Sequence, residues 1–149
     1  MDRIDIGTWA NISAEGWSSL LLGNGASIAI HKEFAYPTLH GIADAKGLLA
    51  TTAPIFAKLG TTDFEHVLLA CWYAEHVNGA LGTPSAAISA AYEEVRTALI
   101  EAVHSVHPVH ADVAADLKRV GAFSSVFPTV VSLNYDLTLY WAMLLFNTA

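Results

Sequence analysis

The chain has 149 residues, with 7 Lys+Arg against 14 Asp+Glu, so its formal net charge is −7. The seven cations are scattered, whereas a surface that binds nucleic acid needs them clustered, which argues against direct binding of DNA or RNA. An apolar fraction of 54% excludes a disordered chain and predicts a single domain over residues 1–149. The mean hydropathy of +0.43 also predicts apolar surface, and hence a protein partner or a homo-oligomer.

Several features of the sequence bear on the compartment. The longest apolar run, residues 137–146, is about half of the roughly 18 residues that a membrane span needs, so no membrane association is predicted. Residues 1–5 carry acidic side chains where a secretory signal is positive. With one cysteine, Cys71, no internal disulfide can form. These features favour a cytoplasmic protein.

The first predicted element is a short buried strand over residues 18–22, which stops at Gly23-Asn24-Gly25. A helix is predicted from Ala26 onward. Prolines and glycines recur between residues 34 and 60, and they predict short helices and connections there.

Longer helices follow. Thr62 and Glu65 have the spacing of a capping box and predict a helix that ends at Asn78-Gly79. Thr83-Pro84 begins the next helix, which keeps an apolar face until Pro108.

A shorter helix is then predicted over residues 111–120, with Gly121 closing it. Residues 126–133 are short and rich in β-branched side chains, which is typical of a strand buried on both faces. Residues 137–146 have the composition of a final helix. Two parallel strands separated by a large helical insertion give a helix-rich α/β fold.

Polar residues follow both predicted strands, where ligands bind in parallel sheets. Gly23 and Gly25 would let the backbone approach a pyrophosphate at a helix N-terminus, and Ser27 would add a hydroxyl. The dinucleotide fingerprint expects a third glycine where Ile28 stands, so a tight structural turn is the competing interpretation.

The second group follows the later strand. Asn134 can hydrogen-bond a ribose hydroxyl or hold a water. Asp136 can accept from a ribose or cap the last helix, and without further information the cap is favoured. No metal site is predicted, because Pro108 interrupts the helix that would bring His104, His107 and His110 together.

Three segments, in this order, resemble motifs of bacterial sirtuin-like proteins. Residues 21–28 resemble the glycine loop, residues 62–68 a phenylalanine-glutamate segment, and residues 132–136 the Asn-Tyr-Asp strand end. The resemblance implies a Rossmann-like fold that binds NAD or a derivative. Active members remove nicotinamide, often as part of antiphage defence.

Carried onto this chain, the resemblance puts Gly23, Gly25 and Ser27 near the phosphates of NAD. It puts Asn134 and Asp136 near the nicotinamide ribose, with Asn134 catalytic only if the protein is active. Active members also use a histidine after the Asn-Tyr-Asp motif, but 13 residues follow Asp136 and none is a histidine. The expectation is therefore a partial Rossmann-like core, truncated after that motif.

The leading functional hypothesis is a non-enzymatic protein-binding module that requires no cofactor. Its suggested setting is a phage or mobile element, as an inhibitor of a bacterial defence complex of the CRISPR type. Tyr140 and Trp141, on the last predicted helix, are the candidate partner contacts. The alternative is an NAD-binding or NAD-hydrolysing sirtuin-like protein.

Overall fold

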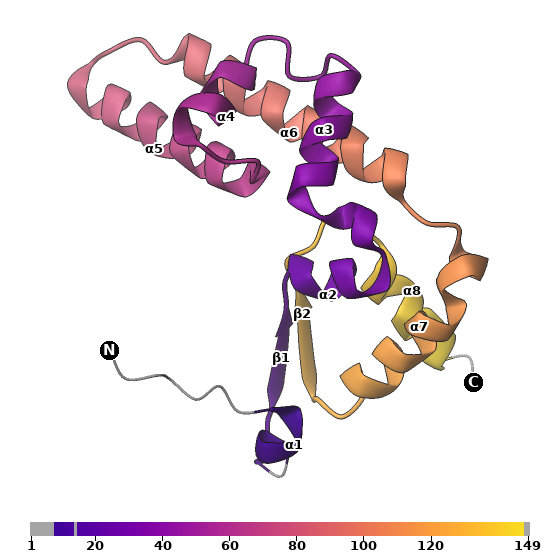
Figure 1. Ribbon diagram of the computed structural model, residues 1–149. Coiled ribbons are helices and arrows are strands. Elements are labelled where there is room, and N and C mark those ends of the chain that lie inside the picture. Colours follow the sequence, from indigo (N-terminus) through magenta and orange to yellow (C-terminus); the bar gives the residue numbers. More distant parts are fainter. Residues whose placement is uncertain (1–7, 14, 148–149) are drawn as a thin grey trace, which may run out of the picture.

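The computed structural model describes residues 8–13 and 15–147, so the acidic segment 1–5 used above lies outside the described residues. From the first strand onward its helices and strands follow the predicted order, and the short helix before that strand was not predicted. They are α1 (Trp9–Ile12), β1 (Ser19–Leu22), α2 (Asn24–Ile30), a 3-10 turn η1 (Lys32–Phe34), α3 (Tyr36–Ala45), α4 (Ala53–Leu59), α5 (Phe64–Leu81), α6 (Ala86–Val106), α7 (His110–Ser124), β2 (Thr129–Ser132) and α8 (Thr138–Asn147). The predicted helix-rich α/β fold, with a large helical insertion between two strands, is confirmed (Figure 1).

The sheet joins the two ends of the chain. β1 and β2 are parallel, with Ser19 opposite Thr129 and Leu22 opposite Ser132. The N–H of Leu133 donates to the carbonyl of Leu22 over 2.9 Å, which carries the pairing one residue further. This register brings the loops that follow the two strands to one end of the sheet.

The strands are not buried on both faces, contrary to the prediction. Leu20, Leu22 and Val130 are half-buried, and Leu22 shares a pocket with residues of α2 and α7. Leu21 and Val131, which lie opposite each other, are 63% and 46% exposed. Figure 1 shows the reason, because α7 and α8 lie on the same side of the strands. No helix or strand of the described residues covers the other face.

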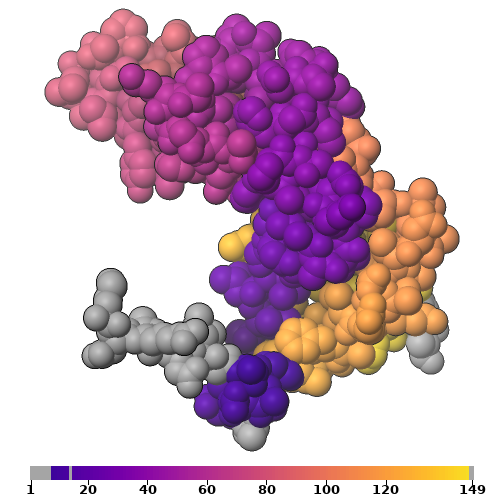
Figure 2. All heavy atoms as spheres, viewed as in Figure 1, coloured from indigo at the N-terminus to yellow at the C-terminus, as the bar shows by residue number. Residues whose placement is uncertain are grey.

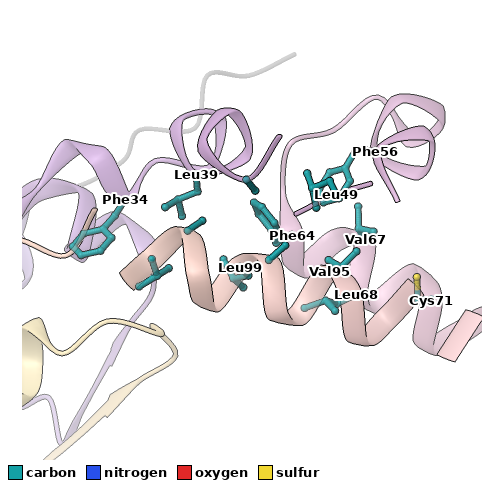
Figure 3. Packing of buried hydrophobic residues seen from close by; sticks show 14 residues of the cluster. Phe34, Leu39, Leu49, Phe56, Phe64, Val67, Leu68, Cys71, Val95 and Leu99 are labelled. Carbon is teal, nitrogen blue, oxygen red and sulfur yellow. The ribbon is translucent and has the colours of Figure 1, made fainter. Parts of the chain in front are cut away.

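The larger hydrophobic core lies among α3, α4, α5 and α6, where most of the helical insertion folds (Figure 3). Phe56 and Phe64 meet edge to face, with ring centroids 5.2 Å apart. Cys71 is buried in this core, and burial raises the pKa of its thiol. Because the thiolate is the nucleophilic form, burial makes this thiol a poor nucleophile.

The helix ends differ from the prediction around α5. Asp63, rather than Thr62, caps it, because the Asp63 carboxylate accepts from the backbone N–H of His66 over 3.0 Å. The helix continues through Asn78-Gly79 and ends at Gly82, which has φ +67°. The left-handed conformation that ends a helix and favours glycine occurs at Gly82 and not at Gly79. Gly79 therefore lies inside the helix.

Gly121 has a packing role and does not end a helix, which corrects a second prediction. It is buried within α7, and a Cβ placed on it would lie 2.9 Å from the carbonyl oxygen of Ala142 and 3.0 Å from Cβ of Phe146. The missing side chain lets α7 approach the backbone of α8. Val113, Leu117 and Ala142 form the small core of this helix pair.

We predict opposite effects for the same substitution at two glycines. Gly121→Ala is expected to lower the free energy of unfolding by about 1–3 kcal/mol, because the new methyl group meets a backbone carbonyl that cannot rotate away. Gly79→Ala, which has open space around it, is expected to raise that free energy by up to about 1 kcal/mol through helix propensity. Urea unfolding followed by circular dichroism measures both. Equal effects of the two substitutions would contradict the packing role.

The side chain of Glu94 joins the start of α4 to α6 by hydrogen bonds. The Glu94 carboxylate accepts from the backbone N–H groups of Thr51 and Thr52, over 2.9 Å and 3.1 Å, and from both hydroxyls. Desolvation by itself would raise the pKa of this carboxyl, but the four hydrogen bonds together lower it below the usual value. Glu94 therefore stays ionised and holds the N-terminus of α4 against α6.

Candidate functional site

Three of the predicted site residues meet beyond the ends of the two strands. The Asn134 side-chain amide donates to Ser27 Oγ over 2.6 Å. The Ser27 hydroxyl in turn donates to Asp136 Oδ2 over 2.5 Å. The sequence separates Ser27 from the other two by more than a hundred residues, and the parallel register of β1 and β2 brings them together.

The Asp136 carboxylate has a second set of partners. Its Oδ1 accepts from the Thr138 backbone N–H over 2.8 Å and from the Thr138 hydroxyl. Asp136 therefore caps the start of the last helix, which is the interpretation that the residue by itself favoured. Because its two oxygens face different partners, Asp136 links the start of α8 to α2.

Ser27 lies at the centre of this network and has no exposed surface. The void that Asn134 and Asp136 line, together with Asn24 and Phe34, is about 20 Å³. This is far below the roughly 300–1,000 Å³ of a small-molecule pocket, so the void by itself cannot hold a nucleotide. The three polar groups satisfy one another's hydrogen bonds.

Gly23 and Gly25 are exposed, and neither has a conformation that requires glycine. Gly23 has φ −108° and ψ −174°, which any residue adopts. Gly25 does not have a positive φ either. The tight turn that the sequence suggested therefore does not depend on glycine. A Cβ on either residue would meet nothing within 4 Å, so both backbones border open space.

A larger pocket lies next to the network, and the sequence did not predict it. It has a volume of about 370 Å³ and is lined by Glu65, Leu68, Leu69 and Trp72 of α5, Tyr92 of α6 and Tyr135. Tyr135 stands between Asn134 and Asp136, so the same strand end contributes to both places. The sequence had indicated only a helix-capping role for Glu65.

Two side chains of this pocket have altered acidity. Burial raises the pKa of the Glu65 carboxyl, although its own backbone N–H opposes the change. Burial, and then the nearby charge of Glu65, raise the pKa of the Tyr135 phenol. The phenol of Tyr135 therefore stays neutral at physiological pH.

The two candidate partner contacts on α8 have different surroundings. Tyr140 is 60% exposed. Trp141 is half-buried and meets the rings of His107 and His110, with centroids 4.7 Å and 5.2 Å away. Adjacent helical positions point in different directions, which is why only Tyr140 faces outward. Contact of either residue with a partner stays a prediction.

The chain belongs to the family described as Domain of unknown function (DUF4917), whose model matches residues 20–148. No curated protein and no solved structure matches the chain. In the described part of the chain, no group of three or more His, Cys, Asp or Glu side chains is arranged to hold a metal ion. The helices of that part also include none with the length and apolar character needed to cross a bilayer.

We predict that Ser27→Ala lowers the free energy of unfolding by about 1–3 kcal/mol, because it leaves the Asn134 amide and Asp136 Oδ2 without their shared partner. Ser125→Ala is the matched control, since this exposed hydroxyl bonds a carbonyl three residues away, and its expected effect is within about 0.5 kcal/mol. Thermal and urea unfolding measure both variants. Similar free energies of unfolding for the two variants would contradict a stabilising role of the Ser27 hydrogen bonds.

Proposed function

We propose that this protein is a non-enzymatic protein-binding module and that the uncovered face of its sheet is a partner-binding surface. The observation that carries the proposal is the exposure of Leu21 and Val131 side by side on paired strands. Leu133, at the end of the same ladder, is 62% exposed. Contiguous exposed apolar side chains of this kind are typical of interaction sites.

The backbone of the sheet supports the same proposal. A sheet of two strands leaves one edge of each strand without a β partner, and such edges accept strands from other chains. In Figure 2 the part that contains α4 and α5 projects beyond the part that contains the sheet.

The charge of the chain bears on the kind of partner. A net charge of −7 favours association with a positively charged surface and disfavours close approach of a second, equally acidic copy. A host protein is therefore the first candidate, and a homo-oligomer the second. The setting we propose is the cytoplasm of a bacterium, where a phage or mobile-element protein with this surface would occupy the nucleic-acid groove of a CRISPR-type defence complex.

The test uses the sheet face itself. Leu21→Ser should weaken binding to the partner at least about tenfold, as expected for a central apolar contact. Leu81→Ser is the matched control, because Leu81 is 74% exposed at the far end of α5. Affinity capture from bacterial lysate would supply the partner, and calorimetry and light scattering of the purified complex would give affinity and stoichiometry. A chain that captures nothing, or equal binding by both variants, would contradict the proposal.

A second candidate function is NAD binding or NAD hydrolysis, which the meeting of Ser27, Asn134 and Asp136 at the strand ends favours. The open space beside Gly23 and Gly25 also leaves room for a ligand backbone to approach. The closed network weighs against it, because a ribose would have to displace the hydrogen bonds among these three side chains. That cost makes protein binding the better supported of the two.

Calorimetric titration with NAD, followed by an assay for free nicotinamide, tests this second candidate. If the candidate holds, the wild type binds NAD, and Asn134→Ala abolishes nicotinamide release while the circular dichroism spectrum is unchanged. Release that persists in Asn134→Ala would reject the assignment of Asn134. Absence of binding would leave the network a purely structural feature.

A further inference from the structure

The aromatic pocket between α5, α6 and the end of β2 has a lining that favours a cationic ligand. Three of its lining residues are aromatic, namely Trp72, Tyr92 and Tyr135, and the one charged lining residue is Glu65. Trp72 is 45% exposed and Tyr135 is 53% exposed, so both rings are accessible. A cavity of about 370 Å³ with aromatic walls and one carboxylate presents negative potential to an incoming group.

The walls of this pocket are held in place by intramolecular contacts. The rings of Trp72 and His76 are 3.9 Å apart, and His76 Nδ1 bonds the carbonyl of Trp72 over 2.8 Å. Tyr135 lies between Asn134 and Asp136, both of which are bound to Ser27. Because these supports exist in the free chain, little ordering is needed when a ligand enters.

We propose that this pocket binds the arginine side chain of a partner protein. A guanidinium is planar, stacks on aromatic rings and pairs with a carboxylate, so it can engage Trp72, Tyr135 and Glu65 together. The charge of the chain, −7 overall, points to a cationic group in the same way. This inference rests on the proposed protein-binding function and specifies one contact of the partner.

A cation of the chain itself lies nearby and has to be considered. Arg96 is close enough to lower the pKa of Tyr135, against the larger effects of burial and Glu65. Its guanidinium pairs with Glu93, with 3.2 Å between Nη1 and Oε2, and it does not line the pocket. Arg96→Gln should therefore leave arginine binding intact or strengthen it by removing a like charge.

The experiment is a titration of the full chain with N-acetyl-arginine amide, followed by the NMR signal of the Trp72 indole N–H. The chain has four tryptophans, and Trp72→Phe identifies the signal. At about pH 8 the probe is expected to shift this signal with millimolar affinity. N-acetyl-citrulline amide, which has nearly the same shape without the charge, is expected to bind at least about fivefold more weakly.

Two variants separate the local carboxylate from the net charge of the chain. Glu65→Gln should weaken binding of the arginine probe at least about fivefold. Glu101→Gln is the matched control, because it removes one negative charge from an exposed position on α6 outside the pocket. Equal loss in both variants, equal binding of the citrulline probe, or weaker arginine binding in Arg96→Gln would overturn the proposal. Tighter binding of tetramethylammonium than of the arginine probe would also overturn it, in favour of a free organic cation.

The arginine contact and the partner-binding sheet face can be tested separately. Leu21→Ser is expected to leave arginine binding unchanged, because Leu21 does not line this pocket. If Leu21→Ser weakens partner binding while Glu65→Gln has no effect on it, the protein-binding function stands and the arginine contact fails. If the chain has no protein partner but the arginine probe binds, the protein-binding function fails and the pocket is a cation site of another kind.

Discussion

The parallel pairing of β1 with β2 is the constraint on which the rest of the structure depends. The paired strands have residues 23–128 between them, so the chain loses considerable conformational entropy when their ends meet. Two short strands cannot repay that cost by themselves. Helices on one face and the hydrogen bonds of Ser27 at the strand ends supply the missing stabilisation. The register of the sheet and the geometry of the polar network therefore support each other.

The same arrangement explains why Leu21 and Val131 are exposed. A parallel sheet normally has helices on both faces, and its strands are apolar on both sides for that reason. Here β1 and β2 have such side chains, but the described helices cover one face. Leu21 and Val131 remain in solvent, at a cost that a partner would recover by covering them. This exposed face is the surface on which the proposed protein-binding function rests.

The strand end after β2 connects the structural network to the aromatic pocket. Asn134 and Asp136 turn toward Ser27, while Tyr135 between them lines the pocket with Glu65 and Trp72. Three consecutive residues thus hold the sheet end and form one wall of the cavity. A ligand in the pocket would contact a residue whose neighbours are already fixed, which is how a rigid scaffold presents a binding residue.

Local patterns in the sequence determined the order and type of the secondary structure. Apolar periodicity identified α5 and α6, a short apolar run identified β1, and a β-branched run identified β2. The polar residues after each strand singled out Ser27, Asn134 and Asp136 as site candidates, but the hydrogen bonds among them were not predicted. These features depend on nearby residues and on the general rule that parallel strand ends meet. The tertiary structure decided the rest. Gly121 is a contact with α8 instead of a helix end, since nothing in its own segment reports the carbonyl of Ala142. Trp72 and Tyr92 come from consecutive helices and Tyr135 from the distant loop after β2, and the packing of these three parts of the chain makes one pocket. No periodicity within a single element encodes that meeting, because it depends on how separate elements pack in space.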